Sequence, residues 1–206
     1  MINGERLVRD VITIGASAGG VTALAGLLQL LPRELPAAVT IVLHRSPLHE
    51  TQLPLVLGRR AALTVIEPVN GEPFQQGVVY VAPRDHHMVL EDGVVRLDRG
   101  AKQHRTRPAI DPLFRSAAAT YGPRVVGVLL SGMGGDGVSG LLEIKRVGGI
   151  SLVQSPDEAE FPTMPNRAIK EDDVDGAFPV AEIAGVLVAL AAGSTVEPGA
   201  SRIVAP

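Results

Sequence analysis

A hydroxyl, an imidazole and a carboxylate each follow an apolar segment of this chain. Ser17 comes shortly after segment 11–14, and His44 directly follows 39–43, 27 positions later. Asp136 lies shortly beyond a third apolar segment, 92 positions further on. A serine activated by an imidazole, which a carboxylate in turn orients, is the nucleophile of many acyl-transfer enzymes. These residue types predict a serine hydrolase, provided that the fold brings them together.

Ser17 is the centre of a G-x-S-x-G motif that spans 15–19. Such a motif needs a tight turn from a strand into a helix, so that the serine is exposed and the following N–H groups face the oxyanion. The alternative is a glycine-rich turn that binds phosphate at the helix N-terminus, or that only caps the helix. A dinucleotide site is disfavoured, because Ser17 stands where the G-x-G-x-x-G fingerprint has its second glycine and His44, not an acid, ends the second strand.

The imidazole has several candidates. His49, His86, His87 and His104 are also present, but only His44 ends a strand expected beside the one that leads to Ser17. We therefore favour His44 as the general base, the alternative being a histidine that only caps a strand end. The pair at 86–87 resembles a metal site faintly, and no cysteine or carboxylate spacing supports it, so we predict no metal.

The carboxylate lies in a segment, 131–137, that contains four glycines. In a triad, Asp136 would fix the tautomer of the imidazole and stabilise the imidazolium. As an alternative, which does not exclude the first, Asp136 is the N-cap of a helix that starts near Val138. The order Ser, His, Asp along the chain differs from the usual order in the α/β-hydrolase fold, but a triad is defined by geometry.

The elements around these residues alternate between strands and helices. Such alternation predicts a doubly wound, mostly parallel α/β sheet with helices on both faces, whose strand ends meet at one edge. The strands expected are 11–15, 39–43, 63–67, 78–82, 87–91, 94–97, 125–130 and 150–154. The helices expected are 20–31, 48–58, 111–120, 138–147 and 179–191.

The middle of the chain departs from this pattern. Segment 78–97 reads as a small antiparallel excursion, because Asp92-Gly93 between apolar runs is a strong hairpin signal. Asp111 and Pro112 suit the N-cap and first position of the next helix. Loops are expected at 98–108 and at 155–171, the second with one helical turn near 166–170. We expect one catalytic domain over 1–192, a flexible tail over 193–206 and no receiver domain.

Composition excludes several classes of protein. Hydrophobic residues make up 46% of the 206 residues, aromatic residues 3%, and cysteine and tryptophan are absent. This excludes disulfides, thiol nucleophiles and a stacking platform for single-stranded nucleic acid. The net charge of −3 gives no reason to expect binding to nucleic acid or membranes. Without a signal sequence or a membrane-length apolar run, the chain is expected in the cytoplasm.

Six segments together resemble the catalytic domain of the chemotaxis-receptor methylesterases, the CheB-type protein-glutamate methylesterase family. The similarity covers roughly 11–187. The segments that carry it are 14–20, 42–44, 79–87, 107–118, 130–137 and 164–165.

This resemblance implies hydrolysis of methyl esters on glutamate side chains of receptor helices, with release of methanol and without a cofactor, and it leaves deamidation of receptor glutamines open. It makes Ser17 the nucleophile, His44 the base and Asp136 the third member, and implies the Met133 N–H as an oxyanion donor. The backbone N–H of Ala18 is expected to be a second donor.

Two departures from the family pattern concern regulation and positioning. The best-known members carry an N-terminal receiver domain, whereas the first strand here begins near residue 11. We therefore expect either a stand-alone form, constitutive or controlled by a separate regulatory or receiver protein, or a domain excised from a longer protein. Ala18 stands where those members often have threonine.

A basic cluster of Lys102, Arg105 and Arg107 is either a solvated loop or a docking surface for an acidic receptor helix. The competing functions are a phosphate- or nucleotide-binding module and a signalling adaptor without esterase activity.

Overall fold

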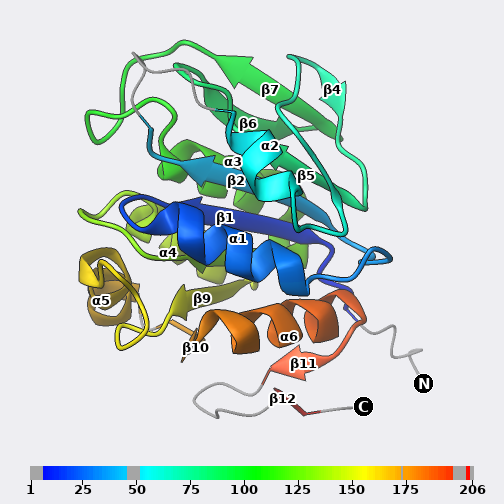
Figure 1. Cartoon of the computed structure of the whole chain (residues 1–206), viewed down its shortest axis with the longest axis vertical. Helices are drawn as coiled ribbons and strands as arrows, with labels where there is room; N and C mark the ends of the chain where they lie inside the picture. The colour runs from blue at the N-terminus through cyan, green and yellow to red at the C-terminus, as the bar shows by residue number, and fades with distance from the viewer. Residues whose placement is uncertain (1–6, 46–51, 173, 197–202, 205–206) are drawn as a thin grey trace.

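The computed structural model describes residues 7–45, 52–172, 174–196 and 203–204 (Figure 1). Its centre is a seven-stranded sheet with the order β10-β9-β8-β1-β2-β5-β3, in which every neighbouring pair is parallel. The doubly wound, mostly parallel fold expected from the sequence is confirmed. The strands are β1 (Val11–Ala16), β2 (Ala38–Leu43), β3 (Thr64–Ile66), β5 (Val78–Val81), β8 (Val125–Leu129), β9 (Ile150–Gln154) and β10 (Gly176–Phe178).

Helices cover both faces of the sheet, as Figure 1 shows with α1 and α6 in front and α3 and α4 behind. Each face has its own aliphatic core, because β1, β2 and β8 are buried along their whole length and point side chains both ways. The helices are α1 (Gly20–Leu30), α2 (Leu53–Gly58), α3 (Ile110–Tyr121), α4 (Val138–Arg146), α5 (Thr163–Asp172) and α6 (Val180–Ala191), with a 3-10 turn η1 (Gly122–Arg124).

A second, three-stranded antiparallel sheet lies beside the main one. It consists of β4 (Glu72–Pro73), β7 (Val94–Asp98) and β6 (His87–Glu91), in the order β4-β7-β6. Asp92 and Gly93 both have positive φ, as the tight hairpin between β6 and β7 requires. The expected excursion is therefore present, but the prediction that 78–82 belongs to it is wrong, since β5 pairs with β2 and β3 in the parallel sheet.

One further prediction needs correction. In place of the loop expected at 155–171, with one helical turn near 166–170, the chain forms the ten-residue helix α5 over 163–172. Pro165 is compatible with this helix, because it falls in the first turn, where a missing N–H breaks no helical hydrogen bond. In the expected flexible tail, β11 (Thr195–Val196) pairs antiparallel with β12 (Ile203–Val204), and the other residues beyond 196 lie outside the described part. The first part of the helix expected over 48–58 also lies outside it. No helix of the described ranges is long and apolar enough to cross a membrane.

Three adjacent strands bring the candidate triad to one edge. β1 lies between β8 and β2, all three parallel, so their carboxyl ends lie side by side. Two backbone bonds beyond the strands continue this register: the N–H of His44 donates to Ala16 O at 3.1 Å, and that of Ser17 to Ser131 O at 3.0 Å. The topology therefore joins residues that are more than 100 positions apart in the chain.

Candidate active site

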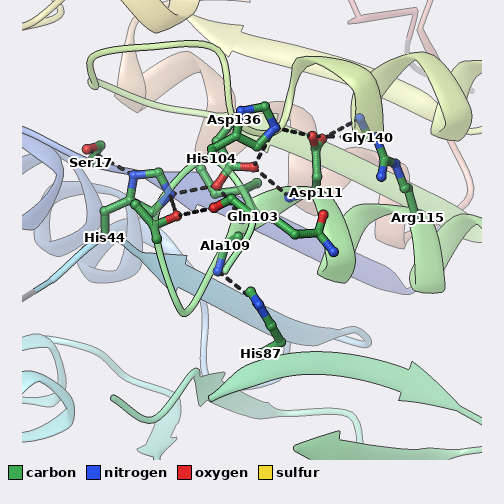
Figure 2. Close-up of polar contacts among 12 residues, drawn as sticks. Ser17, His44, His87, Gln103, His104, Ala109, Asp111, Arg115, Asp136 and Gly140 are labelled. Carbon is green, nitrogen blue, oxygen red and sulfur yellow. Dashed lines mark hydrogen bonds and ion pairs between the residues drawn. The ribbon is translucent and has the colours of Figure 1, made fainter. Parts of the chain in front are cut away.

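Ser17 lies in a sharp turn between β1 and α1. The turn needs Gly19, whose φ of 72° is unfavourable for a residue with a side chain. The N–H of Gly20 donates to Ser17 O at 2.9 Å, so the chain turns into α1 at once. Ser17 is half-buried, and its hydroxyl faces the ring of His44 (Figure 2). This is the strand-turn-helix setting that the G-x-S-x-G motif predicts.

The buried Ser131 fixes this turn from the end of β8. Its hydroxyl donates to Ala18 O at 2.8 Å and accepts a hydrogen bond from the N–H of Phe161 at 3.0 Å. The side chain of Gln154 accepts from the N–H of Ser131 at 2.8 Å. Ser131 thus holds the residue that follows Ser17. Sequence reasoning missed this role, because nothing in a glycine-rich loop marks one of its hydroxyls as structural.

His44 connects the hydroxyl to the carboxylate. Its Nδ1 lies 3.2 Å from Ser17 Oγ, and its Nε2 lies 2.7 Å from Asp136 Oδ2. An ionised carboxylate only accepts hydrogen bonds, so Nε2 carries the hydrogen and Nδ1 is left to accept the serine proton. The two nitrogens are exchanged relative to serine proteases, in which Nε2 faces the serine, but the hydrogen-bond sequence is the same.

Asp136 is buried and accepts hydrogen bonds from two elements. Besides His44, it accepts from the N–H of Ile110 at 2.7 Å and of Asp111 at 3.0 Å, which are the first two residues of α3. Burial raises the pKa of Asp136, but the bonds from His44, Ile110 and Asp111 outweigh it and the pKa is lowered. The carboxylate is therefore ionised and rigidly oriented at neutral pH.

This arrangement corrects two expectations about helix caps. Asp136 caps α3, not the helix α4 that follows it in the chain, whose N-cap is Gly137 without a side-chain bond. Asp111 is not the N-cap of α3 but its second residue. Its buried carboxylate accepts from the N–H of Gly140 at 2.7 Å and so joins α3 to α4.

The two expected oxyanion donors have free N–H groups. Within the described ranges, neither the N–H of Ala18 nor that of Met133 donates to another group. The loop that carries Met133 is held on both sides of Gly132, whose N–H donates to Phe161 O at 2.9 Å and whose carbonyl accepts from the N–H of Met164 at 3.0 Å. The N–H of Met133 is thus available to a ligand while its loop stays fixed.

The other histidines lie in different settings. His86 contacts Arg84 O and accepts a hydrogen bond from Arg99. The buried His87 accepts from the N–H of Ala109 at 3.2 Å, and its Nε2 lies 3.0 Å from Ala101 O. His104 contacts Asp111, while His49 lies outside the described residues. Of the four histidines described, only His44 contacts Ser17.

The three basic residues of the predicted docking surface differ in their contacts. Lys102 and Arg105 are exposed. Arg107 donates to Asp85 at 2.7 and 2.9 Å and to two backbone carbonyls of its own loop, those of Arg99 and Gly100. The hydrogen bonds from Arg107 lower the pKa of Asp85. Arg107 therefore holds the loop in place, which its position in a basic cluster did not reveal.

Comparison with known proteins gives consistent matches. The family model described as CheB methylesterase matches residues 12–187. The protein-glutamate methylesterase/protein-glutamine glutaminase 2 of Anaeromyxobacter dehalogenans is 41% identical over 174 residues, 84% of this chain and 51% of that protein. The protein of the same name from Methanosarcina mazei is 36% identical over 189 residues, 88% of this chain and 52% of that protein. The chain spans about half the length of these relatives.

A solved structure shows the same fold. The crystal structure of the Thermotoga maritima CheB methylesterase catalytic domain superposes with a TM-score of 0.84 at 32% identity. The match covers 88% of this chain and 98% of that one.

Proposed function

Since the chain belongs to the CheB methylesterase family, we propose that it hydrolyses methyl esters on glutamate side chains of chemoreceptors. The observation that supports this most is the hydrogen-bond sequence from Ser17 through His44 to Asp136. An activated serine needs a ring nitrogen that can accept the proton of its hydroxyl and a carboxylate that orients the ring from the other side. This chain provides both groups.

In the first half of the proposed reaction, Ser17 Oγ attacks the ester carbonyl while its proton moves to His44 Nδ1. The imidazolium that forms is stabilised by Asp136, 2.7 Å away and ionised. The carbonyl oxygen becomes an oxyanion, for which the N–H groups of Ala18 and Met133 are the proposed donors. One such donor typically contributes roughly 3–4 kcal/mol to transition-state stabilisation. His44 then returns the proton to the leaving methoxide, and methanol departs.

In the second half, water attacks the glutamyl ester on Ser17. His44 takes a proton from the water and returns it to Ser17 Oγ, which leaves a free glutamate carboxylate on the receptor. Every step uses a side chain or backbone N–H of this chain, so the proposed mechanism uses no metal or organic cofactor.

The same site is suited to deamidation of receptor glutamines. A glutamine side chain presents the same carbonyl at the same distance from the receptor backbone, with ammonia in place of methanol as leaving group. The names of the relatives pair methylesterase with glutaminase. We therefore include glutaminase activity in the proposal as a second reaction of the triad.

The proposed partners are methylated receptor helices, met in the cytoplasm. Exposed Lys102 and Arg105 would contact their acidic surface, while Arg107 would support the loop that carries both residues. Control by a separate regulatory or receiver protein also remains a proposal.

Methanol release from methylated receptor tests the proposal. Wild-type protein should release methanol, and Ser17→Ala should release none while keeping the same fold by circular dichroism. A folded wild type that releases no methanol and deamidates no receptor glutamine would contradict the proposal. Tight nucleotide binding by that protein would favour the binding module instead.

A further inference from the structure

Two buried carboxylates lie next to each other behind His44. Asp111 is fully buried and Asp136 is 2% exposed. One oxygen of each, together with a ring nitrogen of His104, falls within a group whose atoms all lie within 4.8 Å of one another. Two negative charges at this distance in a buried setting repel each other, unless hydrogen-bond donors compensate both.

His104 provides such a donor between the two. Its Nε2 lies 2.9 Å from Asp111 Oδ2 and 3.8 Å from Asp136 Oδ1 (Figure 2). A carboxylate only accepts, so this nitrogen carries a hydrogen that points at Asp111. The other groups near Asp111 are the N–H of Gly140 and the guanidinium of Arg115, which is 3.6 Å away and half exposed.

The loop at 98–108 places His104 by a tight turn. Two backbone bonds between Gln103 and Thr106, at 2.8 and 3.2 Å, close a two-residue turn. His104 and Arg105 occupy it with φ of 50° and 64°. Residues other than glycine, asparagine, aspartate and histidine rarely adopt such angles, so at Arg105 the turn depends on contacts elsewhere that hold it. The bond from His104 to the fixed Asp111 is one such contact.

The same turn reaches His44 directly. Thr106 Oγ1 lies 3.4 Å from His44 Nε2, beside the 2.7 Å contact of that nitrogen with Asp136. Thr106 also donates to Gln103 O at 3.0 Å, so it belongs to the turn that His104 fixes. A displacement of the turn would therefore move one of the two groups that face His44 Nε2.

We propose that His104 is a positioning residue of the triad: its hydrogen bond to Asp111 compensates the second buried carboxylate and holds the 103–106 turn, so that Asp136 and Thr106 stay aligned with His44. This inference rests on the proposed function and goes beyond it, because it assigns a task to a histidine and an aspartate that the reaction itself does not use.

The test compares His104→Ala, His104→Gln and Gln103→Ala. Losing the donor should lower kcat on the order of 10- to 100-fold, with KM changed less than about threefold, because a misplaced catalytic group slows the chemical step. His104→Gln keeps an N–H donor of similar reach and should recover most of the loss. Gln103→Ala keeps the backbone bonds of the turn and is the matched control, with wild-type kcat.

A proton NMR spectrum adds a readout that needs no substrate. The hydrogen between His44 and Asp136 should give a far-downfield resonance in the wild type and in Gln103→Ala, and this resonance should shift or disappear in His104→Ala. The variants must first show the wild-type thermal midpoint within a few degrees. If His104→Ala is less stable than that, all variants are compared at a lower temperature at which His104→Ala is fully folded.

A second background tests the electrostatic reason. In Asp111→Asn a neutral amide replaces the second carboxylate. Adding His104→Ala to this variant should therefore lower kcat by a smaller factor than adding it to the wild type. The inference is wrong if the two losses multiply, if His104→Gln does not restore kcat, or if folded His104→Ala keeps both wild-type kcat and the resonance. A wild type without activity would instead contradict the proposed function.

Discussion

His44 Nε2 and Asp136 Oδ2 lie 2.7 Å apart, and the carboxylate that makes this contact also closes the first turn of α3. One side chain thus serves a helix and a catalytic ring at once. The helix N-terminus brings two N–H donors and the positive end of its dipole to the carboxylate. The hydrogen bond from His44, and after it these two donors, keep Asp136 ionised although it is buried. The ionised carboxylate is the state that stabilises an imidazolium at His44.

Replacing Asp136 should therefore reduce both catalysis and stability. Asp136→Asn has only one accepting oxygen in place of two, so His44 loses its partner for Nε2 or α3 loses its cap. We expect kcat to fall by roughly 10³- to 10⁴-fold, and the free energy of unfolding to fall by about 1–2 kcal/mol. Steady-state kinetics and urea unfolding measure the two effects.

Ser17→Ala separates these effects. The hydroxyl of Ser17 contacts His44 and takes no part in capping a helix. The variant should therefore lose activity and keep the wild-type free energy of unfolding. If Asp136→Asn proves as stable as Ser17→Ala, the proposed role of Asp136 in closing α3 is wrong.

The pH dependence of stability offers an independent check. The pKa of Asp136 lies below its ordinary 3.8 in the folded chain. Above that value the carboxylate is ionised in both states and its contribution to stability is complete. As the pH falls from 3.8 through the folded pKa, the unfolded chain binds the proton more readily and the contribution is lost. The stability difference between wild type and Asp136→Asn should therefore shrink in acid, and a difference unchanged from pH 7 to pH 3 would contradict this.

Much of the fold follows from local patterns in the sequence. All eight strands expected from apolar runs, among them 11–15 and 125–130, match observed ones within one residue at each end. The sequence predicts only one turn of the helix α5, because Pro162 and Pro165 suggest a loop. The first of these prolines precedes the helix and the second lies in its first turn, where proline is tolerated. The two-residue β4 and three-residue β10 are too short to show the alternation of apolar and polar residues that marks a strand. Each forms because a longer strand, β7 or β9, pairs with it.

The triad was predictable, whereas its supports were not. Ser17, His44 and Asp136 each follow a recognisable strand, so topology alone brings them together. The helix that Asp136 caps begins 26 residues earlier in the chain, and a sequence pattern does not show such a long-range cap. For the same reason Asp111 looked like an N-cap, and His104 like one more loop histidine.

Gly132 tests how tightly the site is packed around the nucleophile. A Cβ at this position would lie 3.0 Å from the Cβ of Ser17 and 2.7 Å from the terminal methyl carbon of Met164. Met164 can bend away at its tip, but Ser17 sits in a rigid turn. Gly132→Ala should therefore lower kcat on the order of 10- to 100-fold, as measured by the rate of methanol release.

Gly185→Ala is the control for this glycine. Gly185 lies in α6, and beyond the backbone of its own helix and its chain neighbours no atom lies within 4 Å of the added carbon. We therefore expect full activity and a gain in stability of roughly 0.5–1 kcal/mol. Wild-type kcat in Gly132→Ala would contradict the close packing described for Ser17.

The basic loop should divide into two kinds of residue. Lys102→Gln and Arg105→Gln should raise KM for an acidic receptor and leave kcat nearly unchanged, and their effect should fade at high ionic strength. Arg107→Gln removes the bonds to Asp85 and to the carbonyls of its own loop, so backbone amides of 98–108 should exchange hydrogen faster. If all three variants raised KM equally and left amide hydrogen exchange unchanged, Arg107 would not hold the loop in place.

The most direct test of the whole account is to trap the covalent intermediate. Methylated receptor is mixed with the enzyme, the reaction is quenched in acid during turnover, and the peptide that contains Ser17 is examined by mass spectrometry. We predict a receptor glutamyl ester on Ser17, with the methoxy group lost, and no adduct in Ser17→Ala. Steady methanol release with Ser17 unmodified at every quench time, or undiminished release by Ser17→Ala, would contradict the nucleophile that we propose.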